Sequence, residues 1–392
     1  MPRDPLQPHP VLSGGRPAVD RRAGSSWLRM DLGLFIGALG LSLVGVLLVW
    51  SATGRDHGPQ QALRQLVAVG VGVAAASVVA RLDVRSLRAL APVIHVLAVL
   101  GLAAVVSPLG TTVNGSRSWI RLPGGFTLQP SEFAKVALVI GLAMLLADRS
   151  DRGVMQRHRD VLYAWLVAGV PVGLVLLQPD LGSALVLVAV AVVVIASSGA
   201  PRLWTLGVAA AGLAGVVAAF TTPILSGYQR DRLLAFLDPS LDPQGIGYQT
   251  RQARIAIGSG GLTGQGLFEG RQTQGGYIPF QESDFIFSVA GEELGFIGAV
   301  GLIVLIAFIV LRAVVVARRA DAFGRLVAIG VAVWLAVQSF ESIGMSLGLV
   351  PVTGLPLPFV SYGGSSMIAS WIAVGLIGNL SSVSPRRPGP YG

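Results

Sequence analysis

Residues 277–296, YIPFQESDFIFSVAGEELGF, join a polar, glycine-rich segment to a long apolar segment. Asp284 lies at the junction, and Glu292 and Glu293 follow two to three helical turns further into the apolar segment. A carboxylate where a membrane helix meets water is costly to bury, and ionisable groups at such positions commonly serve function. The stretch therefore predicts that the chain spans a membrane and that Asp284 marks its active site.

The composition of the whole chain favours the same class. Its 392 residues are 53% hydrophobic and 12% charged, with a mean hydropathy of +0.69, which is too apolar for a soluble domain. There is no cysteine, which excludes disulfides and thiol chemistry, and the four histidines have no metal-ligand spacing. The net charge of +9 is explained by arginines in cytoplasmic loops that contact anionic lipid, and no nucleic acid is expected as a partner.

Apolar segments of about 20 residues, the length that crosses a hydrocarbon core, recur ten times along the chain. We therefore expect an all-α polytopic membrane protein with ten transmembrane helices. The predicted segments are 32–50, 65–79, 87–106, 128–147, 161–177, 181–197, 203–225, 285–316, 326–349 and 357–380.

The predicted domains follow from composition and charge. Residues 1–29 are predicted to form a disordered cytoplasmic tail, too long and polar for a signal peptide, and residues 381–392 a cytoplasmic C-terminal tail. With the N-terminus inside, the inner segments hold 19 of the 28 arginines, so both termini are expected in the cytoplasm. Within the membrane domain, residues 30–380, residues 226–283 then form a long extracytoplasmic loop between helices 7 and 8, and loops of this length are usually functional.

The acidic residues of the opening stretch have different expected roles. Asp284 has two compatible interpretations, a helix N-cap and a reactive carboxylate, and the arginines and glycines on the same outer face favour the second. Glu292 and Glu293 lie about 12–14 Å further along the helix axis. We expect them to be structural, with one of them facing a polar bundle interior and pairing with a basic residue.

Two further pairs of charged residues are candidates for binding. Glu132 and Lys135, the only lysine, are at i,i+3 and share a helix face; they are either a self-satisfied ion pair or part of a polar cavity. Arg251 and Arg254 have the same spacing in a predicted outer helix, 248–257, and paired guanidinium groups suit a phosphate or pyrophosphate. Less specific binding of Arg251 and Arg254 to lipid headgroups is the alternative.

Three outer segments add polar candidates. Trp119 lies in a polar loop, where it is either a substrate contact or a membrane-interface anchor. Asp180 follows Pro179 in a tight turn and is expected to cap the next helix. Residues 351–366, which include the candidate binding residue Ser365, combine proline and glycine within apolar sequence, and such broken backbone is tolerated at membrane depth where it lines a cavity.

Five blocks of these residues together resemble the SEDS family (shape, elongation, division and sporulation), and the resemblance covers nearly all of residues 30–380. The blocks are residues 114–135, 178–186, 247–267, 283–296 and 348–366. The resemblance implies a ten-helix peptidoglycan glycosyltransferase of the bacterial cytoplasmic (inner) membrane with its active site on the outer face. It implies that Asp284 is the essential aspartate and that Glu132 and Lys135 are the glutamate and lysine of a membrane cavity.

The block 339–367 looks more like the elongation branch of the family, RodA, than the division branch, FtsW. One departure lies before the aspartate, where the family pattern Pro-x-x-His-Thr-Asp is Pro279-Phe280-Gln281-Glu282-Ser283-Asp284. Glu282 is therefore an additional carboxylate, and Glu282 and Asp284 are the candidates for binding a divalent cation, Mg²⁺ or Mn²⁺. A second departure is Ser342, where the family usually has asparagine.

The resemblance also implies a substrate and partners. The substrate is lipid II, with Asp284 as general base and with Arg251, Arg254, Lys135 or a divalent cation neutralising the leaving pyrophosphate; no organic cofactor is expected. The expected partners are a class B penicillin-binding protein transpeptidase and membrane proteins of the elongation complex. A lipid II flippase, for which the broken helices and the intramembrane pair are equally suited, and a transpeptidase scaffold remain alternatives.

Overall fold

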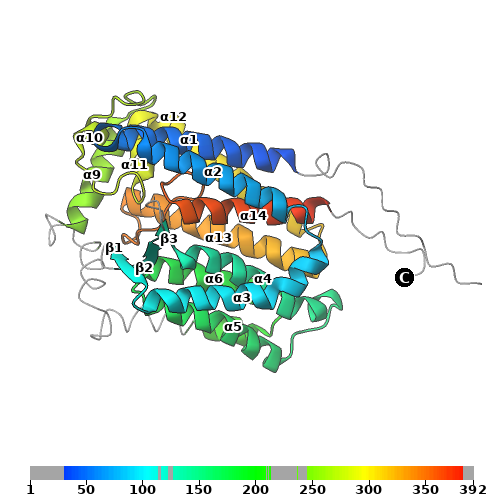
Figure 1. Ribbon diagram of the computed structural model, residues 1–392. Helices are drawn as coiled ribbons and strands as arrows, with labels where there is room; N and C mark the ends of the chain where they lie inside the picture. Colours follow the sequence, from blue (N-terminus) through cyan, green and yellow to red (C-terminus); the bar gives the residue numbers. More distant parts are fainter. Residues whose placement is uncertain are drawn as a thin grey trace, which may run out of the picture.

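The protein is described from a computed structural model that covers residues 31–113, 116–121, 127–208 and 245–382, with the isolated residues 210, 212 and 236. The described residues form long helices that run roughly parallel in one bundle (Figure 1). The helices are α1 (Leu32–His57), α2 (Gln60–Val79), α3 (Val84–Val106), α4 (Pro130–Asp151), α5 (His158–Leu176), α6 (Leu181–Ser197), α9 (Ile246–Ser259), α10 (Arg271–Gly275), α11 (Ile286–Glu293), α12 (Gly295–Ala317), α13 (Ala322–Leu347) and α14 (Gly364–Ser382).

Aspartates fix the start of several of these helices. Asp31, Asp180 and Asp321 each accept a hydrogen bond from the backbone N–H three residues on, at 2.8–3.2 Å. Such a bond satisfies one of the four N–H groups that a helix start leaves unpaired. The predicted capping role of Asp180 is therefore confirmed. Pro130 begins α4, where its fixed φ suits the first helical position and its missing N–H costs nothing.

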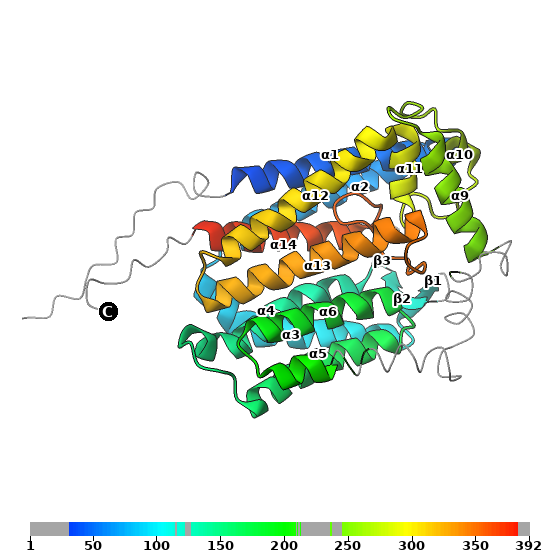
Figure 2. The same ribbon diagram turned by 180° about the vertical axis from the view of Figure 1, so that it is seen from behind.

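The bundle is arranged in tiers, with α13 and α14 in the middle, α1, α2 and α12 on one side, and α4 and α6 followed by α3 and α5 on the other (Figures 1 and 2). Helix α4 is buried along most of its length, while α12 exposes large apolar side chains such as Phe296 and Leu311. An apolar helix surface of this kind is stable when lipid covers it.

Eight helices within the described residues are long and apolar enough to cross a membrane, and α6 is a shorter apolar helix. The prediction of an all-α polytopic membrane protein is therefore confirmed at that level. The seventh predicted segment, 203–225, lies almost entirely outside the described residues, so the count of ten helices stays a prediction. The predicted tails, 1–29 and 381–392, lie almost wholly outside them as well.

The eighth predicted segment, 285–316, is wrong as a single helix. It consists of two helices, α11 and α12, that meet at Leu294 and Gly295. Gly295 has φ +68°, a left-handed backbone conformation that breaks the helix. Residues other than glycine rarely adopt this conformation. The backbone N–H groups of Phe296 and Ile297 then donate to the carbonyl oxygens of Gly261 and Leu262, which ties this break to the loop that follows α9.

Among the described residues, the small sheet and the helices α9 and α10 lie together at one end of the bundle (Figure 1). A three-stranded antiparallel sheet in the order β1 (Gly110–Val113), β2 (Ser116–Arg121), β3 (Thr127–Leu128) lies at this end together with α9 and α10 (Figure 1). The start of α1 and the end of α14 lie at the opposite end of the bundle (Figure 2). The predicted helix 248–257 is confirmed as α9.

Glu292 and Glu293 anchor the loop between α9 and α11, residues 260–285, to this bundle. The Glu292 carboxylate accepts hydrogen bonds from the backbone N–H groups of Gln272 (2.7 Å) and Thr273 (2.9 Å) and from the Thr273 hydroxyl (2.7 Å). Glu293 accepts from the Ser51 hydroxyl of α1 at 2.6 Å. The two buried glutamates are structural, as predicted, but their described partners are neutral N–H and O–H donors rather than a basic residue.

Candidate active site

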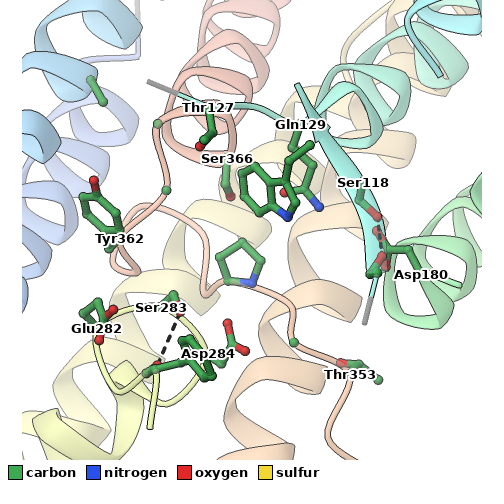
Figure 3. Close-up of a pocket in the computed structure, with 18 of the residues that line it drawn as sticks. Ser118, Thr127, Gln129, Asp180, Glu282, Ser283, Asp284, Thr353, Tyr362 and Ser366 are labelled. Carbon is green, nitrogen blue, oxygen red and sulfur yellow. Dashed lines mark hydrogen bonds between the residues drawn. The ribbon is translucent and has the colours of Figure 1, made fainter. Parts of the chain in front are cut away.

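A cavity of about 310 Å³ opens at the end of the bundle that carries the sheet. Its walls come from six parts of the chain: α2, β2, the residues from β3 to the start of α4, the turn before α6, and the two segments that lead into α11 and α14 (Figure 3). Ligand pockets commonly have volumes of about 300–1,000 Å³. The cavity is therefore large enough to hold a small group of substrate atoms in a mixed polar and apolar environment.

The segment 276–285, which we call the strap, brings Asp284 to the cavity. The strap turns tightly at Phe280, whose φ is +56° and whose carbonyl oxygen accepts hydrogen bonds from the N–H groups of Ser283 (3.2 Å) and Asp284 (2.9 Å). Phe285, rather than Asp284, occupies the cap position of α11. The N-cap interpretation of Asp284 is therefore wrong, and its half-buried carboxylate lines the cavity instead.

The segment 351–363 holds the strap from the other side. The N–H of Tyr362 donates to the carbonyl oxygen of Glu282 at 2.8 Å. The Ser361 hydroxyl donates to the carbonyl oxygen of Ser283 at 2.5 Å and accepts from the N–H of Leu357 at 2.8 Å. The predicted broken backbone thus lines a cavity, and it also fixes the positions of Glu282 and Ser283, the two residues before Asp284.

Gln65 of α2 joins the same network. Its amide Nε2 donates to the carbonyl oxygen of Ser361 at 2.8 Å, and its Oε1 accepts from the N–H of Gly363 at 3.2 Å. Arg64, the preceding residue, lines the cavity and is half-buried. These contacts fix the N-terminal part of α2 relative to the strap, so that Arg64 and Asp284 line one cavity.

The charges around the cavity are unevenly distributed. Arg64 is the single basic side chain among the described lining residues, and three carboxylates line the same space, those of Asp180, Glu282 and Asp284. Arg64 forms no hydrogen bond or ion pair with any described residue. An unpaired guanidinium in a half-buried position favours binding of an anion, above all a phosphate.

Two other predicted site residues have no direct access to this cavity. Glu132 and Lys135 are fully buried and form an ion pair at 2.6 Å. Lys135 Nζ also donates to Gln338 Oε1 at 2.7 Å, and Gln338 Nε2 donates to the carbonyl oxygen of Pro356, a cavity-lining residue, at 2.9 Å. The pair therefore supports the cavity wall from behind.

The remaining predicted site residues divide in the same way. Trp119 lines the cavity from β2. Ser365 lies behind the wall, where its hydroxyl accepts from the N–H of Gln129 at 2.9 Å. Arg251 and Arg254 are exposed on α9 and are not among the lining residues. The structure therefore does not bring the predicted arginine pair to Asp284.

A comparison with known families gives this geometry its context. The FtsW/RodA/SpoVE family model, described as a cell cycle protein, matches residues 28–385. The chain belongs to the FtsW/RodA/SpoVE family. The predicted resemblance to the SEDS family is therefore confirmed over the whole described bundle.

Relatives of this FtsW/RodA/SpoVE chain include enzymes and a solved complex. A probable peptidoglycan glycosyltransferase FtsW of Trichlorobacter lovleyi is 38% identical over 360 residues, covering 90% of this chain and 93% of that protein. A chain from a peptidoglycan synthase complex, described as coordinating polymerization and crosslinking, is 35% identical with a TM-score of 0.76, covering 91% and 98%. The Rod shape determining protein RodA of Thermus thermophilus is 31% identical with a TM-score of 0.66, covering 91% and 97%.

Members called FtsW and RodA both match about nine-tenths of this FtsW/RodA/SpoVE chain. The preference for the RodA branch therefore stays a prediction. Within the site, sequence reasoning missed Arg64, Gln65 and Ser361. The signal for Arg64 was a charged residue directly before the second apolar segment, at the outer end of a predicted helix. Gln65 and Ser361 carry no comparable signal because their role depends on a contact between segments 296 residues apart.

Proposed function

We propose that this chain is a peptidoglycan glycosyltransferase that polymerises lipid II, a disaccharide-pentapeptide carried on undecaprenyl diphosphate. The observation that carries the proposal is that the Asp284 carboxylate and the Arg64 guanidinium, which has no partner among the described residues, line one cavity at one end of a membrane bundle. Transfer of a glycosyl group from a diphosphate to a hydroxyl needs a base and a group that stabilises the leaving anion. The names of the FtsW relative and of the peptidoglycan synthase complex support this chemistry.

In the proposed reaction, O4 of the acceptor N-acetylglucosamine attacks C1 of the sugar at the end of the growing glycan. The O4–C1 bond forms while the bond from C1 to the diphosphate oxygen breaks, and the electron pair leaves with undecaprenyl diphosphate. Asp284 takes the proton from O4, because a hydroxyl is a weak nucleophile without a base in hydrogen-bond reach. A single inverting displacement suffices if the donor linkage is α and the product linkage β, as the family resemblance implies.

Arg64 is the residue that we assign to the leaving diphosphate. It replaces Arg251, Arg254 and Lys135 in that role, because Lys135 is buried and paired with Glu132 and the two arginines lie outside the cavity. A guanidinium without a counter-ion loses little on binding an anion, and its planar donors match phosphate oxygens. Positive charge at this position stabilises the negative charge that develops on the diphosphate.

A divalent cation fits the acidic side of the cavity when the substrate supplies further ligands. Glu282 and Asp284 both line the cavity, and the described residues include no group of three or more His, Cys, Asp or Glu side chains suited to a metal ion. Mg²⁺ usually binds through one or two carboxylates together with water and substrate phosphates. We therefore propose Glu282 and Asp284 as ligands of Mg²⁺ or Mn²⁺, which when bound supplies positive charge beside the diphosphate.

The membrane setting follows from the substrate and the bundle. A polyprenyl chain is soluble only in the bilayer, so a polymerase that uses it benefits from membrane helices next to its catalytic cavity. The arginine distribution favours cytoplasmic termini. Strand β2, which lines the cavity, lies at the end of the bundle opposite to the start of α1 and the end of α14 (Figures 1 and 2). We therefore propose an active site on the outer face of the bacterial cytoplasmic membrane.

The proposed partner is a class B penicillin-binding protein that cross-links the new strands. Support comes from the similarity to a chain of a complex that coordinates polymerization and crosslinking. The role in elongation, with other membrane proteins of that complex, rests on the similarity of residues 339–367 to the RodA branch.

The decisive experiment is polymerisation of lipid II by the purified protein in detergent, with and without Mg²⁺. We expect glycan strands from the wild type and none from the Asp284→Asn variant, with the two proteins unfolding at the same temperature. A flippase makes no strands without another enzyme, and a scaffold tolerates Asp284→Asn. Wild-type activity in that variant would exclude Asp284 as the base.

A further inference from the structure

The two carboxylate oxygens of Asp180 lie in different environments. Its Oδ1 accepts a hydrogen bond from the N–H of Ser183 at 3.0 Å and so caps α6. Its Oδ2 is buried and has no hydrogen-bond partner among the described residues. Asp180 is only 8% exposed, and it lines the cavity. Capping therefore explains one oxygen of this residue and leaves the other unexplained.

A buried carboxylate oxygen without a partner loses its hydration and gains nothing in return, so it calls for a donor from water or from a ligand. The cavity supplies access for such a donor. Ser366, on the first turn of α14, repeats the pattern: it is 4% exposed, it lines the cavity, and its Oγ is likewise without a partner among the described residues. Two buried oxygens of residues that line this cavity thus have no hydrogen-bond partner in the described part of the chain.

The surroundings of these two oxygens indicate the kind of ligand. Figure 3 shows Ser118, Gln129, Asp180 and Ser366 on one side of the pocket, away from Glu282 and Asp284. Trp119 lines the same cavity and presents part of a flat apolar surface. Hydroxyl and amide N–H donors combined with an apolar ring face are the features of a pyranose, and rings of this kind pack well on an indole.

We propose that Asp180, Ser366 and Trp119 form a sugar subsite for an N-acetylated hexose of the lipid-linked substrate. Asp180 Oδ2 accepts a hydrogen bond from a sugar hydroxyl or from the acetamido N–H, the Ser366 hydroxyl bonds a second polar group, and the ring packs against Trp119. This inference rests on the proposed function. It divides the cavity between a wall that holds the sugar and a wall, with Arg64 and Asp284, at which the bonds change.

The test exploits the fact that asparagine caps a helix about as well as aspartate. Asp180→Asn keeps a capping oxygen for Ser183 and replaces the unpartnered oxygen by an amide that donates rather than accepts. Asp321→Asn is the matched control, because Asp321 caps α13 by the same contact, to the N–H of Gly324 at 2.8 Å. We expect Asp180→Asn to raise KM for lipid II about tenfold or more without lowering the unfolding temperature, and Asp321→Asn to leave both unchanged.

Binding measurements distinguish the contribution of the sugar to affinity from that of the diphosphate. In the Asp284→Asn background, which blocks turnover, Asp180→Asn should weaken binding of lipid II about tenfold and leave binding of undecaprenyl diphosphate within about twofold. Trp119→Ala should follow the same pattern. Lipid I, which has one sugar, distinguishes the two sources: equal weakening of lipid I and lipid II assigns the sugar next to the diphosphate, and weakening of lipid II alone assigns the outer sugar.

Two results would overturn the subsite. One is unchanged lipid II binding in Asp180→Asn, which leaves this residue as a cap alone. The other is that Asp180→Asn weakens binding of lipid II and of undecaprenyl diphosphate equally. The substitution then acts on diphosphate binding or on the fold, and not on a sugar. Failure of the proposed function is a separate result: the wild type then makes no glycan strands, while the binding measurements still report on the sugar.

Discussion

The hydroxyl group of Ser361 lies 2.5 Å from the carbonyl oxygen of Ser283, the residue before Asp284. The same hydroxyl accepts from the N–H of Leu357, so Ser361→Ala removes two hydrogen bonds, one buried and one partly buried. Because a displacement of about 1 Å at a catalytic group costs up to 10²-fold, we expect kcat for polymerisation to fall about ten- to hundredfold. The unfolding temperature should fall by a few degrees, since each hydrogen bond contributes about 1 kcal/mol. Ser381→Ala is the control, because that hydroxyl bonds Gly378 O within α14.

Arg64→Ala should reduce kcat for lipid II polymerisation about a hundredfold or more, because removal of one donor to a developing anion typically costs 10²–10³-fold. Arg64→Lys should recover part of the activity, since lysine supplies the charge without the planar pair of donors. Arg251→Ala and Arg254→Ala are the matched controls, and we expect both within about threefold of the wild type. If the α9 variants lose activity and Arg64→Ala keeps it, the diphosphate is bound by Arg251 and Arg254 rather than by Arg64.

Glu132 and Lys135 offer a test of stability. Removal of one member of a fully buried ion pair leaves the other charge uncompensated, which costs about 3–5 kcal/mol. Glu132→Gln and Lys135→Met should therefore each lower the unfolding temperature in detergent markedly. The double variant leaves no buried charge at the pair and should regain most of the loss. Additive losses in the double variant would contradict direct coupling between the two side chains.

Gly295→Ala tests the break between α11 and α12. A Cβ at this position would lie 2.2 Å from the backbone N of Gly264, so the substitution forces the loop that contains Gly264 away from the bundle. The φ of +68° is in addition strained for alanine. We expect a loss of at least about 2 kcal/mol and reduced polymerisation. Gly301→Ala is the control on α12, where a Cβ meets no atom within 4 Å and alanine favours the helix. Equal stability of the two variants would show that the break is not strained by a side chain.

The sequence predicts well those features that depend on local composition. Eight described spans, α9, the cap at Asp180 and the cavity beside Asp284 all follow from apolar length, turn residues or a carboxylate at a membrane boundary. The break at Gly295 was missed because glycine occurs throughout these segments and its φ depends on contacts with residues 261–264. The position of the arginine pair of α9 outside the cavity could not be predicted, because i,i+3 spacing establishes a shared helix face and says nothing about which way that face points.

The hydrogen bonds that Glu292 accepts from Gln272 and Thr273 bear on how members of this family can be recombined. The Gln281 amide extends the same connection, donating to the carbonyl oxygens of Thr273 (3.0 Å) and of Ala52 in α1 (2.8 Å). The loop between α9 and α11 therefore cannot be exchanged by itself for the corresponding loop of a relative. A chimaera that takes residues 260–285 from a relative also needs the acceptors on α11 and α1 to match, so functional grafts are expected when the loop and α11 are exchanged as one unit.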